Sequence, residues 1–206
     1  MYIPKYFSVK DEKFILGFME KNSFGILLTA NGEEVMNSHI PILVGKNGDD
    51  IVLRGHLATE NNQWEKSTDH PVSILFLGPH HYISPRWYKD ESSVPTWNYA
   101  VVKATGIFKI LSRVQAEKLL VDLSRKFDQE WSSRGKEKEL YYQKMVDQIV
   151  AFQIKVDLLE AKWKMSQNRP KEDIPIIVHE LQEINTELSL ETASEIKKQN
   201  HNRIIK

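Results

Sequence analysis

Polar side chains that can bind an anion gather late in the chain, in the segment AKWKMSQNRPKED (residues 161–173). Two lysines flank Trp163, and a run of hydrogen-bond donors ends at Arg169, directly before Pro170. An arginine offers a fork-shaped pair of donors that suits phosphate or carboxylate, and lysines add point charges. The segment therefore predicts one half of a binding site for an anionic ligand.

A matching half is expected upstream, in LRGHLATENNQW (residues 53–64). Arg54 and His56 are two positions apart, so both side chains leave the same face of an extended strand, and Gly55 between them allows close backbone approach. We expect this face to suit a planar, anionic ligand, with Arg54 and Arg169 as phosphate donors. Tryptophans could wall an aromatic ring of that ligand, and the candidates are Trp64, Trp97 and Trp163.

Composition limits the chemistry that the 206 residues can perform. Lysine and arginine (28) balance aspartate and glutamate (28), and there is no cysteine. A net charge of zero gives no overall attraction to nucleic acid or anionic membranes. Without thiolates, redox chemistry requires a cofactor. No stretch reaches the roughly 18 apolar residues of a membrane span, and we expect a cytoplasmic protein that does not enter the membrane.

Motifs of several enzyme classes are missing from the sequence. The seven histidines show no metal-type spacing such as HExxH, and GxSxG, Walker A and GxGxxG are absent. We therefore expect no metal site and assign no catalytic residue. His56 or Tyr99 could serve as a substrate base, and neither is assigned that role.

Hydrophobic periodicity predicts an α+β fold that is mainly β. Six apolar or alternating runs predict strands at residues 24–30, 35–44, 51–57, 71–78, 100–111 and 150–164. Asn31-Gly32 and Asn47-Gly48 predict hairpins. Helices are expected at residues 8–22, capped by Ser8, at 112–131, at 136–149 and beyond Pro170. The pattern favours a small closed or split β-barrel with peripheral helices.

Residues 171–206 are expected to form a helical segment that follows the predicted strands. Leu181, Ile184 and Leu188 share one face of an expected amphipathic helix. We predict a barrel domain at residues 1–170 and a C-terminal helical extension at 171–206 that packs on the domain or on a partner.

The motifs together resemble the PaiB family, flavin-binding negative transcriptional regulators in the superfamily of FMN-binding split barrels. The resemblance covers most of residues 1–170 and rests on MYIPKYF, SHIP, LRGHLA with NNQW, GPHHYISPRWY, VPTWNY and KWKMSQNRP. It implies a six-stranded antiparallel split β-barrel, a homodimer with FMN at the subunit interface, and repression of sporulation and degradative-enzyme genes.

The resemblance also implies which residues hold the flavin. Ser38, His39 and Ile40 would lie along its ring. Arg54, Gly55, His56 and Leu57 would lie near the ring or the phosphate. The residues implied near the phosphate tail are Asn61, Asn62 and Gln63, and those that would close the site are Lys164, Gln167 and Arg169. Enzymes of the superfamily typically carry lysine where ENNQW supplies amides, and neutral donors bind phosphate less strongly. FMN binding is therefore expected to be weak or lost.

Three functions stay open at this point. The first is flavin-dependent regulation, which we expect to be indirect, because no helix-turn-helix pattern or basic footprint supports DNA binding. The second is an FMN-dependent oxidoreductase or a haem-handling enzyme of the same superfamily. The third is a dimeric interaction scaffold that binds no ligand.

Overall fold

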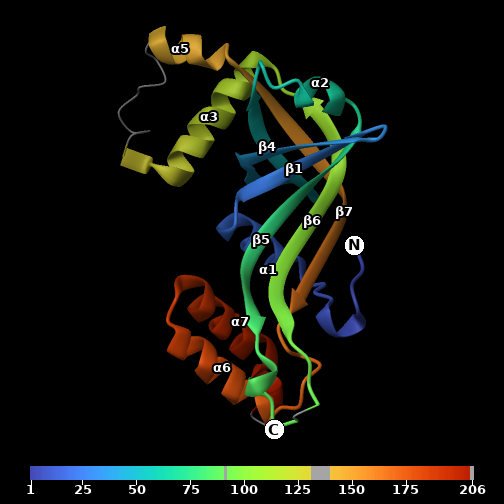
Figure 1. The fold of residues 1–206 in the computed structure, drawn as a ribbon. Coiled ribbons are helices and arrows are strands. Elements are labelled where there is room, and N and C mark those ends of the chain that lie inside the picture. Colours follow the sequence, from blue (N-terminus) through green and yellow to red (C-terminus); the bar gives the residue numbers. More distant parts are fainter. Residues whose placement is uncertain (91, 131–139, 205–206) are drawn as a thin grey trace. The chain divides into compact units, whose positions relative to one another are not determined.

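The computed structural model describes residues 1–90, 92–130 and 140–204 (Figure 1). Seven strands form one sheet in the order β2-β1-β5-β6-β7-β4-β3. The strands are β1 (Phe24–Asn31), β2 (Glu34–Pro41), β3 (Leu43–Asn47), β4 (Asp50–Ala58), β5 (Pro71–Ile83), β6 (Thr96–Ile110) and β7 (Ile149–Lys164). The helical elements are η1 (Lys5–Phe7), α1 (Glu12–Lys21), α2 (Gln63–Ser67), η2 (Pro85–Trp87), α3 (Arg113–Phe127), α5 (Leu140–Val146), α6 (Asp173–Ile184) and α7 (Glu187–Ile204).

The chain divides into two compact units. The central unit consists of Leu16–Phe76 and Lys103–Leu159, and the terminal unit of Met1–Ile15, Leu77–Val102 and Glu160–Lys206. The long strands β5, β6 and β7 each supply residues to both units. The predicted boundary at residue 170 is not tested by this division and stays a prediction.

The α+β, mainly β class is confirmed, but the predicted count of six strands is wrong for the described residues. The run 35–44 contains two strands, because Pro41 has no N–H for a ladder and the fully buried Ile42 donates its backbone N–H to the Ser23 carbonyl instead, at 2.8 Å. β2 then pairs with β1, and β3 with β4. Since only Ile42 separates the two edge strands, the sheet of the central unit must curl back on itself, as in a split barrel.

Both predicted hairpins are confirmed. Asn31 faces Glu34 and Asn47 faces Asp50 in antiparallel registers, and the glycine in each two-residue turn has a positive φ, 63° at Gly32 and 60° at Gly48. Glycine adopts this conformation without steric cost.

The core of the central unit lies between the curled strands. Phe108 and Phe152 stack there with ring centroids 4.4 Å apart. On the outer face, α3 begins with a capping box made by Ser112 and Gln115 and packs Leu119 and other small or apolar side chains onto Ala151. α3 thus lies within the predicted helix 112–131.

Two other helix predictions need correction. Asp11, not Ser8, caps α1, by accepting the backbone N–H of Phe14 at 3.0 Å. The single helix predicted beyond Pro170 is two helices, α6 and α7, because Asn185 takes a left-handed conformation at φ 53° and ends α6. The helix predicted at 136–149 lies partly outside the described residues. No helix in the described ranges is long and apolar enough to cross a membrane.

Candidate functional site

Ser38, Asn61 and Gln63, three of the residues implied by the family resemblance, form one hydrogen-bonded network in the central unit. Ser38 Oγ donates to Gln63 Oε1 at 2.6 Å and accepts from Asn61 Nδ2 at 2.9 Å. Asn61 Oδ1 in turn accepts the backbone N–H of Gln63 at 3.0 Å. The loop before α2 is thereby tied to β2.

The Gln63 side chain has a structural task in this network. It is 1% exposed, and its Nε2 donates to the Leu27 carbonyl at 3.2 Å and to Thr29 Oγ1 at 3.0 Å. A buried amide with satisfied partners has little left to offer a phosphate. The neighbouring Asn62 is exposed, and its side chain caps no backbone group, so it is the amide of ENNQW that remains accessible.

β2 directs its other two implied residues to different environments. Ile40 is buried in the core, whereas His39 is exposed and lies beside the Phe24 ring, with ring centroids 6.4 Å apart. Contact of either residue with a flavin ring stays a prediction.

β4 separates the four residues of RGHL onto two faces, as the alternation predicts. Gly55 and Leu57 point into the core, where a side chain at Gly55 would come within 2.9 Å of the Phe152 ring. Gly55 was expected to allow a close approach to the backbone, and the group that lies close to it is the Phe152 ring. Arg54 and His56 lie together on the opposite, half-buried face.

Arg54 sits at the edge of a polar cleft of about 250 Å³. The cleft is lined by Gly45, Lys46, Asn47, Val52, Arg54 and Gln153. The Arg54 guanidinium also lies 3.5 Å from the Asp122 carboxylate of α3. Any anion that binds Arg54 must share it with Asp122.

One ring nitrogen of His56 has no hydrogen-bond partner in the described structure. This atom, Nδ1, is buried. Burial lowers the pKa of His56 below the ordinary value of 6.5, because removal of water disfavours the charged ring. His56 is therefore neutral at pH 7.

The residues predicted to close the site lie in the terminal unit. They belong to what we call the donor corner, residues 163–169, which runs from the end of β7 towards α6. Gln167 holds the corner together: its Oε1 accepts the Met165 backbone N–H and its Nε2 donates to the Trp163 carbonyl, both at 2.7 Å. Gln167 therefore shapes the corner, and the charges are left to Lys164 and Arg169.

Lys164 and Arg169 are positioned by side chains of the segment before and within β6. Lys164 Nζ donates to Thr96 Oγ1. The Arg169 guanidinium lies 4.0 Å from the centroid of the Tyr88 ring and 3.4 Å from Ser93 Oγ. Burial raises the pKa of Tyr88, an effect that the charge of Arg169 partly offsets, so the phenol stays neutral at physiological pH.

Burial and two neighbouring positive charges act on the ionisation of Lys164. Burial lowers the pKa of Lys164, and the positive charges of Lys162 and Arg169 lower it further. Like charges held together disfavour the charged form. An anion bound among these side chains would relieve that repulsion.

Asn98 is a polar residue beside the donor corner that the sequence reasoning left unassigned. It is fully buried, its Nδ2 donates to Ser166 Oγ at 2.7 Å, and its Oδ1 has no partner in the described structure. Buried amides are usually satisfied at both ends. The signal was present, because Asn98 lies in the VPTWNY motif, but the motif alone does not give the direction of its side chain.

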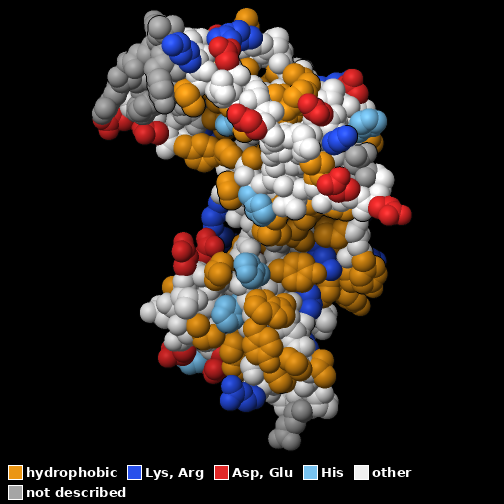
Figure 2. Space-filling model, turned by 45° about the horizontal axis from the view of Figure 1, so that its top comes forward, with side chains coloured by type: hydrophobic (Ala, Val, Ile, Leu, Met, Phe, Trp, Pro, Cys, Tyr) orange, Lys and Arg blue, Asp and Glu red, His pale blue; other side chains and the backbone are white. Residues whose placement is uncertain are grey.

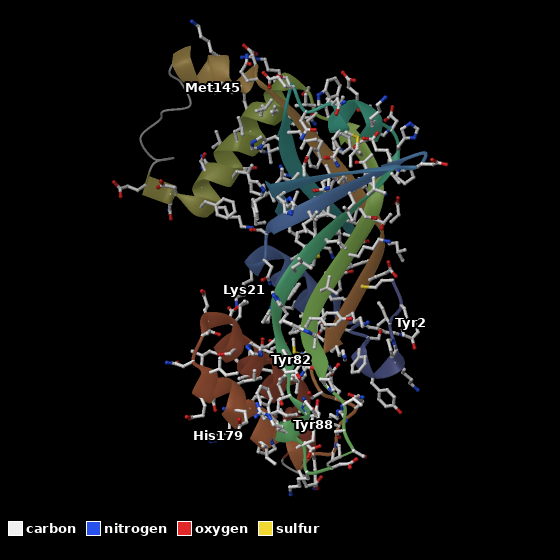
Figure 3. All side chains as sticks on the ribbon, viewed as in Figure 1. Tyr2, Lys21, Tyr82, Tyr88, Met145 and His179 are labelled. Atoms are coloured by element: carbon white, nitrogen blue, oxygen red, sulfur yellow. The ribbon has the colours of Figure 1, made fainter. Side chains whose placement is uncertain are left out.

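An aromatic recess of about 270 Å³ lies on the same unit. It is lined by Leu77, Gly78, His80, Trp97, Tyr99, Ala100 and Val101. Trp97 is 54% exposed and has His80 and Tyr82 rings at centroid distances of 6.2 and 6.3 Å. Figure 3 labels Tyr82, whose ring contacts Trp97, and Tyr88, whose ring contacts Arg169. Figure 2 shows hydrophobic side chains beside histidine side chains on one face of the molecule.

The three candidate tryptophans thus have different environments. Trp97 presents its ring to solvent, whereas Trp163 is fully buried and Trp64 is half-buried with its indole N–H bonded to the Thr59 carbonyl at 3.0 Å. Within the described ranges, no cluster of histidine, aspartate or glutamate side chains could hold a metal ion.

Comparison with known proteins identifies the family. The family model described as "Putative FMN-binding domain" matches residues 1–158. The chain belongs to this family. It is 34% identical over 191 residues to the "Protease synthase and sporulation protein PAI 2" of Bacillus subtilis (strain 168), a match that covers 88% of this chain and 89% of that protein. The resemblance to the PaiB family is thereby confirmed.

Relatives of this chain are also found outside bacteria. An uncharacterized protein of Aspergillus fumigatus is 28% identical over 237 residues, covering 87% of this chain and 90% of its own length. Two solved structures share the fold: the FAD and heme binding protein from Mycobacterium smegmatis (TM-score 0.61, 14% identity, 82% and 78% of the two chains) and the flavocytochrome Anf3 from Azotobacter vinelandii (TM-score 0.62, 8% identity, 79% and 72%).

The structure therefore brings the implied residues together in two groups. Ser38, Asn61 and Gln63 form one group in the central unit, and Lys164, Gln167 and Arg169 form the other in the terminal unit. That both groups contact one flavin stays a prediction.

Proposed function

We propose that this protein binds a flavin, with FMN as the preferred form, and that it acts as a flavin-dependent regulator. The observation that carries the proposal is the pair of cations held in the donor corner: the Arg169 guanidinium lies over the Tyr88 ring, 4.0 Å from its centroid, and Lys164 Nζ donates to Thr96 Oγ1. Membership of a family of FMN-binding domains supports the same ligand.

The donor set of the corner fits a phosphate group. Arg169 is held by a stacking contact with Tyr88, so its fork of N–H groups is oriented before any ligand arrives. Lys164 adds a second positive charge, and Lys162, directly before the corner, adds a third. Charge-assisted hydrogen bonds from such groups are about twice as strong as neutral ones. Bonds from the corner would therefore compensate for the weaker phosphate binding expected of the neutral amides in ENNQW.

The aromatic recess fits a planar ring. Its wall is the exposed indole of Trp97, and Lys162 Nζ lies 5.2 Å from the centroid of the neighbouring Tyr99 ring. A flavin supplies redox chemistry when it is bound. The residues of this chain would hold and orient it, with the phosphate on the cations and the ring against an aromatic surface.

The biological role that we propose follows the Bacillus subtilis relative, whose name refers to protease synthesis and sporulation. The protein would act as a homodimer that represses such genes in response to its flavin. With a net charge of zero, it would act on gene expression through metabolism or a protein partner, since DNA-binding domains usually carry a basic face.

Titration of purified protein with FMN, followed by quenching of flavin fluorescence, tests the ligand. Arg169→Ala should raise the Kd about tenfold or more, because loss of a charged hydrogen bond costs about 1.5–3 kcal/mol. Lys171→Ala removes a charge two positions away that is exposed, and should have little effect. Equal affinity in wild type and Arg169→Ala would refute the assignment of the corner.

A further inference from the structure

The C-terminal helix α7 is bonded to the donor corner by a buried asparagine. Asn200 is fully buried, and its Nδ2 donates to the Met165 carbonyl at 2.8 Å and to the Ile196 carbonyl of its own helix at 2.9 Å. A single side chain thus joins the last helix to the backbone of the corner, 35 residues earlier in the chain.

A second side chain of α7 fixes the start of the corner. Glu195 Oε1 accepts the indole N–H of the fully buried Trp163 at 3.1 Å. The same oxygen accepts Gln199 Nε2 at 3.0 Å, which orients the carboxylate from within the helix. Trp163 also packs against Phe14, with ring centroids 5.2 Å apart, so its indole has one defined position.

The corner needs this support because its own sequence does not favour its conformation. Ser166 has a φ of 63°, a left-handed conformation that costs free energy for any residue with a Cβ and persists only when the surroundings impose it. The surroundings are Asn98, which bonds the Ser166 hydroxyl, and the contacts of α7 with Met165 and Trp163 on the residues just before it.

We infer that α7 is a positioning element for the anion site, and that Asn200 and Glu195 are its positioning residues. They hold the backbone on both sides of Lys164, so that Lys164 and Arg169 are presented together in spite of their repulsion. The inference rests on the proposed flavin site. It gives a role to a helix that lies beyond the family match, which ends at residue 158.

The test compares Asn200→Ala, Glu195→Ala and Glu195→Gln in the full-length protein, with Ser194→Ala as a control on an exposed position of the same helix. Hydrogen exchange of the backbone amides of residues 163–169 reports the position of the corner, and FMN titration reports the site. Glu195→Gln keeps an oxygen that accepts the indole N–H, so it should behave as wild type.

We expect Asn200→Ala and Glu195→Ala to speed amide exchange in the corner and to raise the Kd for FMN about fivefold or more, the size expected when a hydrogen bond that holds a site is lost. Faster exchange with unchanged affinity would overturn the inference, as would unchanged exchange in both variants. Should Asn200→Ala fail to fold, the Glu195 pair decides, since that side chain is partly exposed.

Failure of the proposed function can be told apart from failure of this inference. If wild type itself binds no FMN, the flavin site is wrong. Exchange in the corner then decides whether α7 positions it: faster exchange in Glu195→Ala but not in Glu195→Gln upholds the positioning, and no difference between the two overturns it.

Discussion

At the scale of single residues, the structure shows how charge and burial set the ionisation of the side chains that matter. Lys164 and His56 both have lowered pKa values, but for different reasons: burial and two neighbouring cations act on Lys164, and burial alone acts on His56. The ionisation of Lys164 affects anion binding at alkaline pH, and the ionisation of His56 affects stability in acid.

Lys164 leads to a prediction about ligand affinity at alkaline pH. Only protonated Lys164 attracts an anion, and its pKa lies below the ordinary 10.5. FMN affinity should therefore fall as pH rises through the alkaline range, and the fall should begin at a lower pH than for an ordinary lysine. Lys164→Arg keeps the charge throughout this range and should flatten the profile. Identical profiles for the two proteins, measured by fluorescence titration, would refute the role of Lys164.

His56 leads to a prediction about stability in acid. Its folded pKa lies below the unfolded value of 6.5, so the unfolded chain takes up the proton first as pH falls. The contribution of neutral His56 is present above pH 6.5 and is lost below it, at up to about 1.4 kcal/mol per pH unit. His56→Gln should reduce this loss in urea unfolding between pH 7 and about 5, whereas His39→Gln, at an exposed position, should not.

Sequence alone gave the residue types of the site but not the direction of each side chain. Arg169 and Lys164 are predicted as donors to the ligand, and that role stays a prediction. Gln63 and Gln167 had the right chemistry for a ligand, yet their amides are bonded to backbone groups and to nearby side chains. Which partner an amide finds depends on contacts between distant segments, and these follow from the packed fold.

At the scale of elements, periodicity predicted most strands and both hairpins, and failed where tertiary contacts decide. The division of 35–44 into β2 and β3 follows from Pro41, which has no N–H for the ladder, and from the buried Ile42, which donates its backbone N–H to the Ser23 carbonyl. The division of the C-terminal helix follows from the left-handed Asn185. Neither interrupts the pattern of apolar residues, so neither could be read from it.

Gly106 of β6 leads to a prediction about packing between strands. A Cβ at this position would lie 1.9 Å from the Lys155 carbonyl oxygen, and backbone cannot yield as a flexible side chain can. Gly106→Ala should therefore lower the free energy of unfolding by about 3 kcal/mol.

The matched control for this substitution is Gly45→Ala. Gly45 is also in a strand, but a Cβ there meets nothing within 4 Å, so the free energy of unfolding should change by no more than about 0.5 kcal/mol. Urea unfolding followed by circular dichroism measures both variants, and similar losses for the two would contradict the packing argument.

At the scale of the whole molecule, the exposed aromatic surface of the terminal unit leads to a prediction about assembly. Leu77 is 53% exposed and Trp97 54%, and apolar side chains gathered in this way often mark an interface. If the proposed homodimer uses this surface, Trp97→Asp should shift the protein towards monomer in analytical ultracentrifugation. Val114→Asp, at an exposed apolar position of α3, should leave the mass unchanged.

Flavin binding through the donor corner is tested most directly by comparing FMN with riboflavin, which has the same ring and no phosphate. Kd values for both ligands are measured by fluorescence titration of wild type and Arg169→Ala. We predict that wild type binds FMN about tenfold or more tightly than riboflavin, and that Arg169→Ala removes most of this preference while riboflavin binding stays the same. Equal binding of FMN and riboflavin by the wild type, or an unchanged preference in Arg169→Ala, would contradict the account.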